Sequence, residues 1–371
     1  MDSSTSADES TGIFPAGYTA PRTTEQLMQY HKDHATHASV DPIIPMNNIE
    51  ERLKLIKEIQ AGVSEDQKDK SKDSRLTYFQ LAYFLLCPDS ALRKVIDDRF
   101  HGSYLEAQIQ YISSFLIGTF KVSYERPFRD NSYREENTHE QNEEILERLN
   151  QLERGRKNLP QKKAEKEKCL VRDYYRCIFT QDESPKVYQI LPFIASYGSW
   201  TFIQLIDAFS CFKVVLGSEV WSQLCYVVTI NSEMCDKSWN MISLGPDLRK
   251  LWKEQFFGIQ CLGILPIDRQ ASAIWLQFHW MPRNQRDYND RAELNMDTIQ
   301  KMLLIISPKK NDIVKKYRRR TQNPLETGHI VSIRMGKEEA ISMKQVIDFR
   351  WVIARIGAIS GHARKWSIFY Q

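Results

Sequence analysis

The hydrophobic positions in the first third of the chain predict helices. Apolar residues recur at helical spacing between residues 49 and 63, and Asn48 followed by Glu51 predicts a capping box where that helix begins. The apolar segments 78–86 and 104–120 predict two further helices. This part of the chain is therefore expected to form a region of three helices.

Later segments change between the period of a strand and the period of a helix. Residues 271–280 alternate and carry large aromatic side chains, which predicts a strand, and residues 329–334 predict a second one. Residues 343–356 predict a closing helix, whereas residues 283–330 read as irregular and polar. Helices and strands that follow one another in this way predict the α+β fold class.

A densely charged segment of both signs covers residues 135–168. Ile145, Leu149 and Leu152 place one narrow apolar stripe on it, which is typical of a solvated amphipathic helix. Such a helix can be a spacer or a dimer seam over residues 135–159, and the stripe is too short to indicate a coiled coil.

These changes of pattern divide the chain into five predicted segments. They are a flexible tail (1–46), a helical region (47–134), a charged helical linker (135–168), a central module (169–282) and a mixed C-terminal extension (283–371). The tail contains His31, His34 and His37, which could hold a metal ion if the segment were helical. A polar tail with chance histidines is the preferred interpretation, so no metal is expected there.

Composition narrows the class of protein. Apolar residues make up 42% of the 371 residues, which is typical of a globular chain. The net charge of +4 is small and spread over mixed charges, so a nucleic acid partner is not expected. The basic segment 309–320 leaves nuclear import open as an alternative to a solvated loop.

Cysteine usage and the short apolar runs favour the cytoplasm. The seven cysteines are odd in number and form no Cys-x-x-Cys pair, which indicates reduced thiols. The first eleven residues are acidic and rich in serine, so neither a secretory signal nor a transit peptide is expected. No apolar run reaches the ~20 residues of a membrane helix, so no membrane association is expected.

The central module predicts two strands, an insertion and a helix. Residues 177–180 are rich in strand-forming residues, residues 182–186 carry turn chemistry, and residues 187–191 predict a returning strand. Aromatic residues at helical spacing occupy residues 200–228. The Gly-Pro pair at 245 and 246 then predicts a turn into a second helix. The expected order is that of a small ββα unit.

The residues of this module resemble the HNH nuclease-like proteins that are widespread in filamentous fungi. In that family the first strand reads Arg-Asp-x-x-x-Cys-x-x-Thr, the second His-Ile-x-Pro-Phe, and the last block Asn-Leu-Ile-x-Leu-x-x-x-x-His followed by a Trp. The resemblance covers residues 169–282, under a third of the chain. The matching positions are Arg172, Asp173, Cys177, Thr180, Ile190, Pro192, Phe193, Asn240, Leu244, Trp252, Trp280 and Pro282.

The departures from the family concern the residues that carry its chemistry. The histidine that activates water in the family falls on Gln189, and the histidine that helps to hold the divalent cation falls on Arg249. Tyr188 occupies the position before the general base, so Asn240 alone remains of the name-giving trio. An amide cannot act as a general base near neutral pH, a loss typically worth ~10²–10⁴ in rate. A guanidinium is always charged and would repel the cation, so no metal or other cofactor is expected.

The remaining cleft is expected to bind a small molecule. Gln189, Arg249, Tyr188 and Asn240 are the predicted catalytic residues, because their side chains can donate hydrogen bonds to a carbonyl or carboxylate. Aromatic residues are expected to line the pocket. The predicted substrate-binding residues are Trp200, Trp239, Trp252 and Phe256.

Such a pocket can act through positioning alone. Holding a flexible molecule in a reactive pose is worth ~7–11 kcal/mol in the best cases. The first expectation is therefore a metal-free cyclase of fungal secondary metabolism, for example of the Diels–Alder type. The alternatives are a catalytically inactive interaction protein, with the aromatic residues forming the core, and a residual endonuclease rescued by His279.

Overall fold

The computed structural model describes residues 40–66, 75–97, 160–191, 213, 215, 221–222, 236–253, 255–304 and 325–361. The described part is an α+β protein, as expected. Its N-terminal helices are α2 (Ile49–Asp66), α3 (Tyr78–Leu86) and α4 (Asp89–Asp97). The central elements are α7 (Pro160–Arg172), β1 (Lys186–Gln189), the 3-10 helix η4 (Ser238–Asn240), β2 (Met241–Leu244) and α10 (Pro246–Lys253). The remaining elements are β3 (Phe257–Pro266), β4 (Ala271–Trp280), α11 (Met296–Met302), β5 (Ile330–Gly336) and α13 (Lys337–Ser360).

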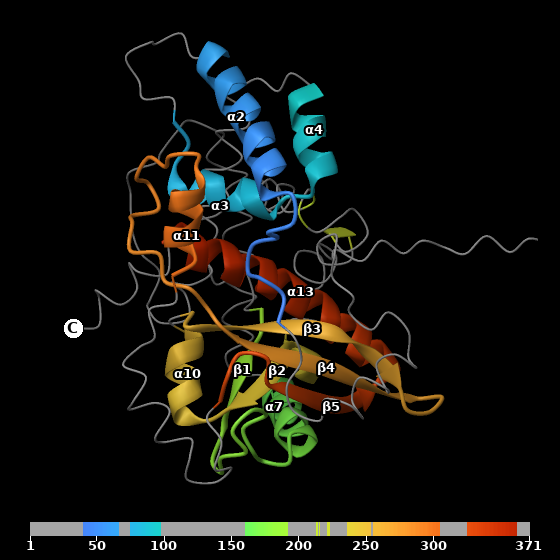
Figure 1. Cartoon of the computed structure of the whole chain (residues 1–371). Coiled ribbons are helices and arrows are strands. Elements are labelled where there is room, and N and C mark those ends of the chain that lie inside the picture. Colours follow the sequence, from blue (N-terminus) through green and yellow to red (C-terminus); the bar gives the residue numbers. More distant parts are fainter. Residues whose placement is uncertain are drawn as a thin grey trace, which may run out of the picture.

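Two antiparallel sheets form the lower half of the molecule (Figure 1). One pairs β1 with β2, and the other has the order β3-β4-β5. β4 is the central strand of the second sheet and coincides with the predicted strand 271–280. β3 was missed, because its first six residues are all buried and leave no alternation of polar and apolar positions.

The long helix α13 joins the two halves of the molecule. It contacts β3 and β4 on one side and α3 on the other, and Figure 1 shows it running between the N-terminal helices and the sheets. It extends beyond the predicted residues 343–356 at both ends and ends at Gly361, whose φ of 85° is the left-handed conformation of a helix C-terminus.

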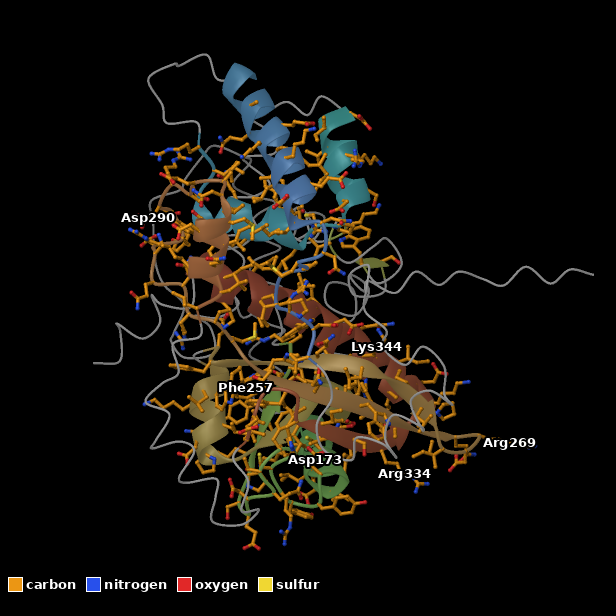
Figure 2. The ribbon with its side chains drawn as sticks, viewed as in Figure 1. Asp173, Phe257, Arg269, Asp290, Arg334 and Lys344 are labelled. Carbon is orange, nitrogen blue, oxygen red and sulfur yellow. The ribbon has the colours of Figure 1, made fainter. Side chains whose placement is uncertain are left out.

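One hydrophobic core connects segments that the sequence separates. Its largest cluster includes Ile56 of α2, Phe84 of α3, Phe257 of β3 and Ile353 of α13. Phe257 lies where α10 meets the second sheet (Figure 2), with its ring centroid 4.7 Å from that of Phe278. The N-terminal helices and the strands therefore share one core. The predicted boundary between residues 168 and 169 falls inside α7.

The helix predicted from residue 49 is present, but its first turn differs from the prediction. Ile49, Leu53 and Ile56 form its buried face. Asn48 has a φ of 58°, in the left-handed region, whereas the capping residue of a capping box has an extended backbone. A capping box is found instead at α3, between Thr77 and Gln80.

The predicted strand 177–180 is wrong. Ile178 and Phe179 lie in a turn, where the Cys177 amide donates to the Asp182 carbonyl at 3.0 Å. The partner of β1 is β2, with Tyr188 opposite Ile242, and Ile178 joins that sheet through one bond to the Ser243 carbonyl. Cys177, Ile178 and Phe179 are buried because they fill the core beneath the turn, not because they pair as a strand.

The polar stretch 283–330 contains the helix α11, which the sequence reading missed. The Asn295 side chain accepts a hydrogen bond from the Thr298 amide at 2.8 Å and caps this helix. The predicted tail up to residue 39, the helix 104–120, residues 135–159 and the basic segment 309–320 lie outside the described residues. Among the described helices, none has a span long and apolar enough to cross a membrane.

Candidate functional site

β1, β2 and α10 form a unit of β–β–α order around the predicted site. The residues between β1 and η4 separate the two strands in the chain, and β2 leads through Gly245 directly into α10. Pro246 is the first residue of α10, where its fixed φ favours a helix and its missing amide hydrogen is not needed. This unit carries Tyr188 and Gln189 on its first strand and Arg249 on its helix.

Tyr188 and Arg249 lie together. The guanidinium carbon of Arg249 is 6.0 Å from the centroid of the Tyr188 ring, and the two side chains also form a hydrogen bond. Burial raises the pKa of Tyr188, and the charge and hydrogen bond of Arg249 oppose that rise. The phenol is therefore protonated at neutral pH, and both side chains are only partly buried.

Gln189 is placed away from this pair. Successive side chains of a strand point to opposite faces, so Gln189 and Tyr188 do not share a face. The Gln189 Nε2 donates to the Asp236 Oδ1 at 2.7 Å. Asp236 was not among the predicted site residues, because no local pattern links it to Gln189 across 47 residues.

Asn240 holds the backbone that follows β1. Its Oδ1 accepts from the Leu191 amide at 2.9 Å, and its Nδ2 donates to the Leu191 carbonyl at 2.7 Å. The Asn240 carbonyl also accepts from the Ile190 amide at 2.8 Å. Both polar atoms of the buried side-chain amide thus hold Leu191, and the backbone carbonyl holds Ile190.

The predicted aromatic lining is divided between the core and the surface. Trp239 and Trp252 are 4% and 5% exposed and belong to the main hydrophobic cluster. Phe256 is half-buried, and the guanidinium carbon of Arg283 lies 3.5 Å from its ring centroid. Trp200 lies outside the described residues.

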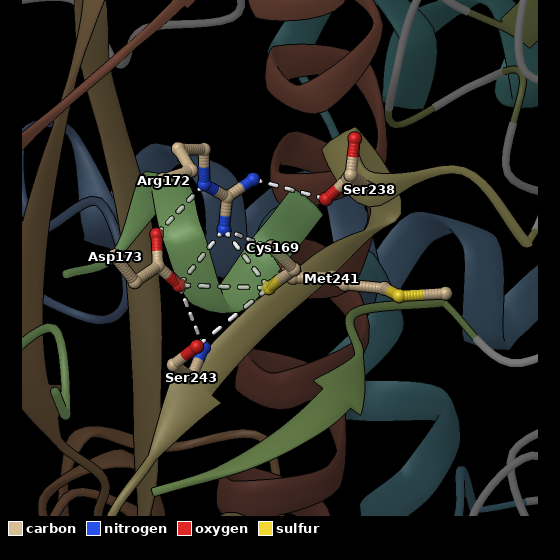
Figure 3. Close-up of polar contacts among 6 residues, drawn as sticks. All are labelled: Cys169, Arg172, Asp173, Ser238, Met241 and Ser243. Carbon is tan, nitrogen blue, oxygen red and sulfur yellow. Dashed lines mark hydrogen bonds and ion pairs between the residues drawn. The ribbon is translucent and has the colours of Figure 1, made fainter. Parts of the chain in front are cut away.

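The Arg-Asp pair at the end of α7 builds a buried network (Figure 3). Arg172 donates to both carboxylate oxygens of Asp173 at 2.7 and 3.0 Å, and to the carbonyls of Ser238 and Met241 at 2.9 and 2.8 Å. Asp173 also accepts from the Ser243 amide at 3.0 Å. These bonds attach α7 to η4 and β2.

The opposite charges of Arg172 and Asp173 stabilise each other inside this network. Burial works to lower the pKa of Arg172, but the hydrogen bond and charge of Asp173 outweigh it and leave that pKa raised. Cys169 lies within the network, and burial raises the pKa of its thiol to about 12. The thiol is therefore neutral and unreactive near neutral pH. The Arg-Asp pair thus orients the strand that leads into the site.

The described residues offer no ready metal centre. They contain no group of three or more His, Cys, Asp or Glu side chains arranged to hold an ion. His279, the histidine within residues 169–282, is fully buried on β4, and burial lowers its pKa to about 3. Its Nε2 bonds to the Gln277 side chain at 2.9 Å.

Comparisons with known proteins add no relative. No family model matches the chain, and neither do curated proteins or solved structures.

Proposed function

We propose that this chain is a non-nucleolytic descendant of an HNH-type ββα module that acts on a small apolar molecule bearing a carboxylate or carbonyl. The observation that carries the proposal is the pairing of Arg249 with Tyr188 in the β–β–α unit, with the guanidinium 6.0 Å from the phenol ring. A guanidinium beside a protonated phenol offers several hydrogen-bond donors and no base. Such a pair suits an anion or a polarised carbonyl and does not suit a metal-bound hydroxide.

The proposed chemistry is an intramolecular ring closure that proceeds by positioning. Arg249 would hold the carboxylate and Tyr188 would polarise the carbonyl, so that the two reacting parts of one molecule meet. A cycloaddition of this kind forms its new bonds from the π electrons of the substrate and needs no proton transfer from the protein. The half-buried Phe256 is the residue of the predicted lining that would contact the apolar part of the ligand. The proposed location is the cytoplasm, which the four buried free cysteines of the described residues favour.

The first experiment tests whether nuclease activity is gone. Purified protein with Mg²⁺ or Mn²⁺ should leave supercoiled plasmid DNA uncut, because Gln189 cannot activate water. Nicking that requires the divalent ion and is lost in Gln189→Ala would contradict the proposal.

A second experiment tests the anion site. Binding of an apolar carboxylate, with decanoate and cinnamate as probes, should be measured by calorimetry at neutral pH. Charge-assisted hydrogen bonds are worth ~1.5–3 kcal/mol, so Arg249→Ala should weaken binding by roughly 10- to 150-fold. Lys250→Ala is the matched control, since Lys250 is the exposed neighbour of Arg249 on α10 and should leave affinity unchanged. Equal affinity of Arg249→Ala and the parent protein would remove Arg249 from the site.

The second candidate function is a protein-interaction module. Asn240, Trp239 and Trp252 are used by the fold, as a catalytically inactive descendant would use them. The turn after α7 also exposes Tyr174 by 80% and Tyr175 by 52%, and both have a φ near +55°. Bulky residues seldom adopt that conformation, and exposed aromatic pairs are enriched at interfaces. Failure of both probes to bind, together with loss of a co-purifying partner in Tyr174→Ser, would favour this candidate.

A further inference from the structure

A cluster of polar side chains, four of them buried and one half-buried, lies apart from the candidate site, between the second sheet and α13. We call this set the buried polar cluster. Its members are Asp41 before α2, Gln260 on β3, Gln277 and His279 on β4, and Arg355 on α13. Gln260 and Gln277 are direct cross-strand partners, and His279 follows Gln277 by two residues on the same face.

The hydrogen bonds within the cluster fix the roles of its atoms. The Asp41 carboxyl group accepts a bond from Gln260 and lies within the electrostatic influence of Arg355. The His279 Nε2 lies 2.9 Å from the Gln277 Oε1. Because that oxygen can only accept, Nε2 carries the hydrogen, and Nδ1 of the neutral ring is an acceptor.

Each member has one more buried atom without a partner in the protein. These atoms are Asp41 Oδ2, Gln260 Oε1, Gln277 Nε2, His279 Nδ1 and Arg355 Nε. The cost of five unmet buried groups is comparable to the whole stability of a domain, so such groups recruit ordered water. Three acceptors and two donors in one place suit water, which can serve both.

The segment 40–46 covers this cluster. Ile43 packs against the apolar group formed by Met281, Trp351 and Ala354, and Ile44 is fully buried. Figure 1 shows the chain running from the sheet at β3 up to the start of α2. Asp41 is half-buried and therefore lies against Gln260 of the sheet and close enough to Arg355 of α13 to feel its charge.

Asp41 is the member whose charge changes in weak acid. Burial raises its pKa to about 6, although the Gln260 bond and Arg355 oppose the rise. Burial lowers the pKa of Arg355 to about 10, with Asp41 raising it and Arg52 of α2 lowering it further. His279 has a pKa of about 3, lowered by burial and by Arg355. At pH 5 to 7.5 Arg355 is thus charged and His279 is neutral, while Asp41 titrates.

We propose that residues 40–46 form a clasp that closes over the buried polar cluster when Asp41 is protonated and loosens when Asp41 is ionised. A carboxyl group that binds its proton more tightly in the closed form favours closure at low pH. With a pKa of about 6 when closed and 3.8 when exposed, the opening equilibrium rises about tenfold between pH 5 and pH 7.5. His279 should not titrate differently when the clasp opens. Its ring centroid lies 4.7 Å from that of Trp351 on α13, which would still cover it in the open form.

The clasp can be followed in the full chain through an introduced thiol. Ile43→Cys places a reporter in the half-buried position that packs on α13, and its rate of alkylation is measured by mass spectrometry between pH 5 and pH 7.5. Each rate is divided by that of the same thiol in the urea-unfolded chain at the same pH, which removes the titration of the thiol itself. We expect the ratio to rise about tenfold over this range.

Two further substitutions in the Ile43→Cys protein test whether Asp41 causes the rise in the alkylation ratio. Asp41→Asn keeps the acceptor for Gln260 but cannot ionise, so the ratio should stay flat and near its value at pH 5. Glu50→Gln is the matched control, because Glu50 is an exposed acid of α2, and the tenfold rise should persist. A flat ratio in the Ile43→Cys protein, or an unchanged rise with Asp41→Asn, overturns the proposal.

A direct titration covers the case in which Asp41→Asn does not fold. The carbon-13 shift of the Asp41 carboxyl group in the unmodified protein should report a midpoint near pH 6. A midpoint below about pH 4.5 would show that closure does not favour the protonated form, and the clasp would be overturned.

Discussion

Replacing Asp173 with alanine should destabilise the protein strongly while leaving its surface unchanged. Asp173 receives two hydrogen bonds from Arg172 and one from the Ser243 amide, at 2.7, 3.0 and 3.0 Å. The exposed fractions of the two paired side chains are 10% for Arg172 and 0% for Asp173. The substitution would therefore leave a charged guanidinium with little water to replace its partner.

The size of the effect follows from this burial. Removing one partner of a buried ion pair costs about 3–5 kcal/mol, mainly because the other charge stays buried without compensation. An exposed pair in the same region gives the contrast. Arg176 and Glu183 are 3.4 Å apart, and their side chains are 41% and 64% exposed. Arg176→Ala should cost less than about 1 kcal/mol.

Urea unfolding followed by fluorescence and circular dichroism measures both variants. The double substitution Arg172→Met with Asp173→Leu should recover much of the loss, since apolar side chains of similar size need no counter-charge. If Asp173→Ala unfolds within about 1 kcal/mol of the parent protein, the Arg172–Asp173 pair does not hold α7 on β2. The reasoning from burial would then be refuted.

Three more predictions concern the core and the second sheet. Phe257→Ala removes a fully buried ring and should lower the free energy of unfolding by about 3–5 kcal/mol in urea titrations. Gly258→Ala would place a Cβ 2.7 Å from the Trp351 ring and should lower the free energy of unfolding by about 1–3 kcal/mol. Gly62→Ala meets open space on α2 and should raise it by about 0.5–1 kcal/mol. Equal effects of the two substitutions would contradict the packing at Gly258. His279 has a folded pKa of about 3, below the 6.5 of the exposed group, so its contribution is complete above pH 6.5 and is lost as the pH falls toward 3. Between pH 7 and pH 5 this loss is about 2 kcal/mol, so the change in unfolding free energy over this range should be less favourable by about 2 kcal/mol in the parent protein than in His279→Gln, as measured in urea at both pH values.

Local patterns predicted the elements that are rich in apolar or aromatic residues or whose ends carry clear turn signals. The bounds of α3 and β4 agree with the predicted segments 78–86 and 271–280, and the turn at Gly245 leads into α10 as expected. The same reasoning missed β3, because residues buried on both faces carry no period of two. It also misassigned residues 177–180, whose strand-forming side chains serve to fill the core.

The candidate site also contains residues that the sequence predicted and a residue that it did not. Sequence reasoning named Tyr188 and Arg249, and the fold brings them together as a contact of β1 with α10. Asp236, which accepts a hydrogen bond from Gln189, was not predicted. Among the predicted residues, Asn240 bonds to the backbone of Leu191, and Trp239 and Trp252 lie in the main hydrophobic cluster. Residue type alone does not distinguish an amide side chain that binds a ligand from one that forms hydrogen bonds with a neighbouring backbone segment.

Local patterns in the residues predicted the α+β fold class and the positions of several helices and strands, among them α3, β4 and α10. The three-dimensional packing was needed to show that β1 pairs with β2, that Arg172 donates to the Met241 carbonyl across 69 residues, and that Asp41 lies beside Gln260 of β3 and near Arg355 of α13. The reason is physical. Periodicity and turn chemistry act over a few neighbouring residues, whereas pairing and burial depend on which distant segments exclude water from one another.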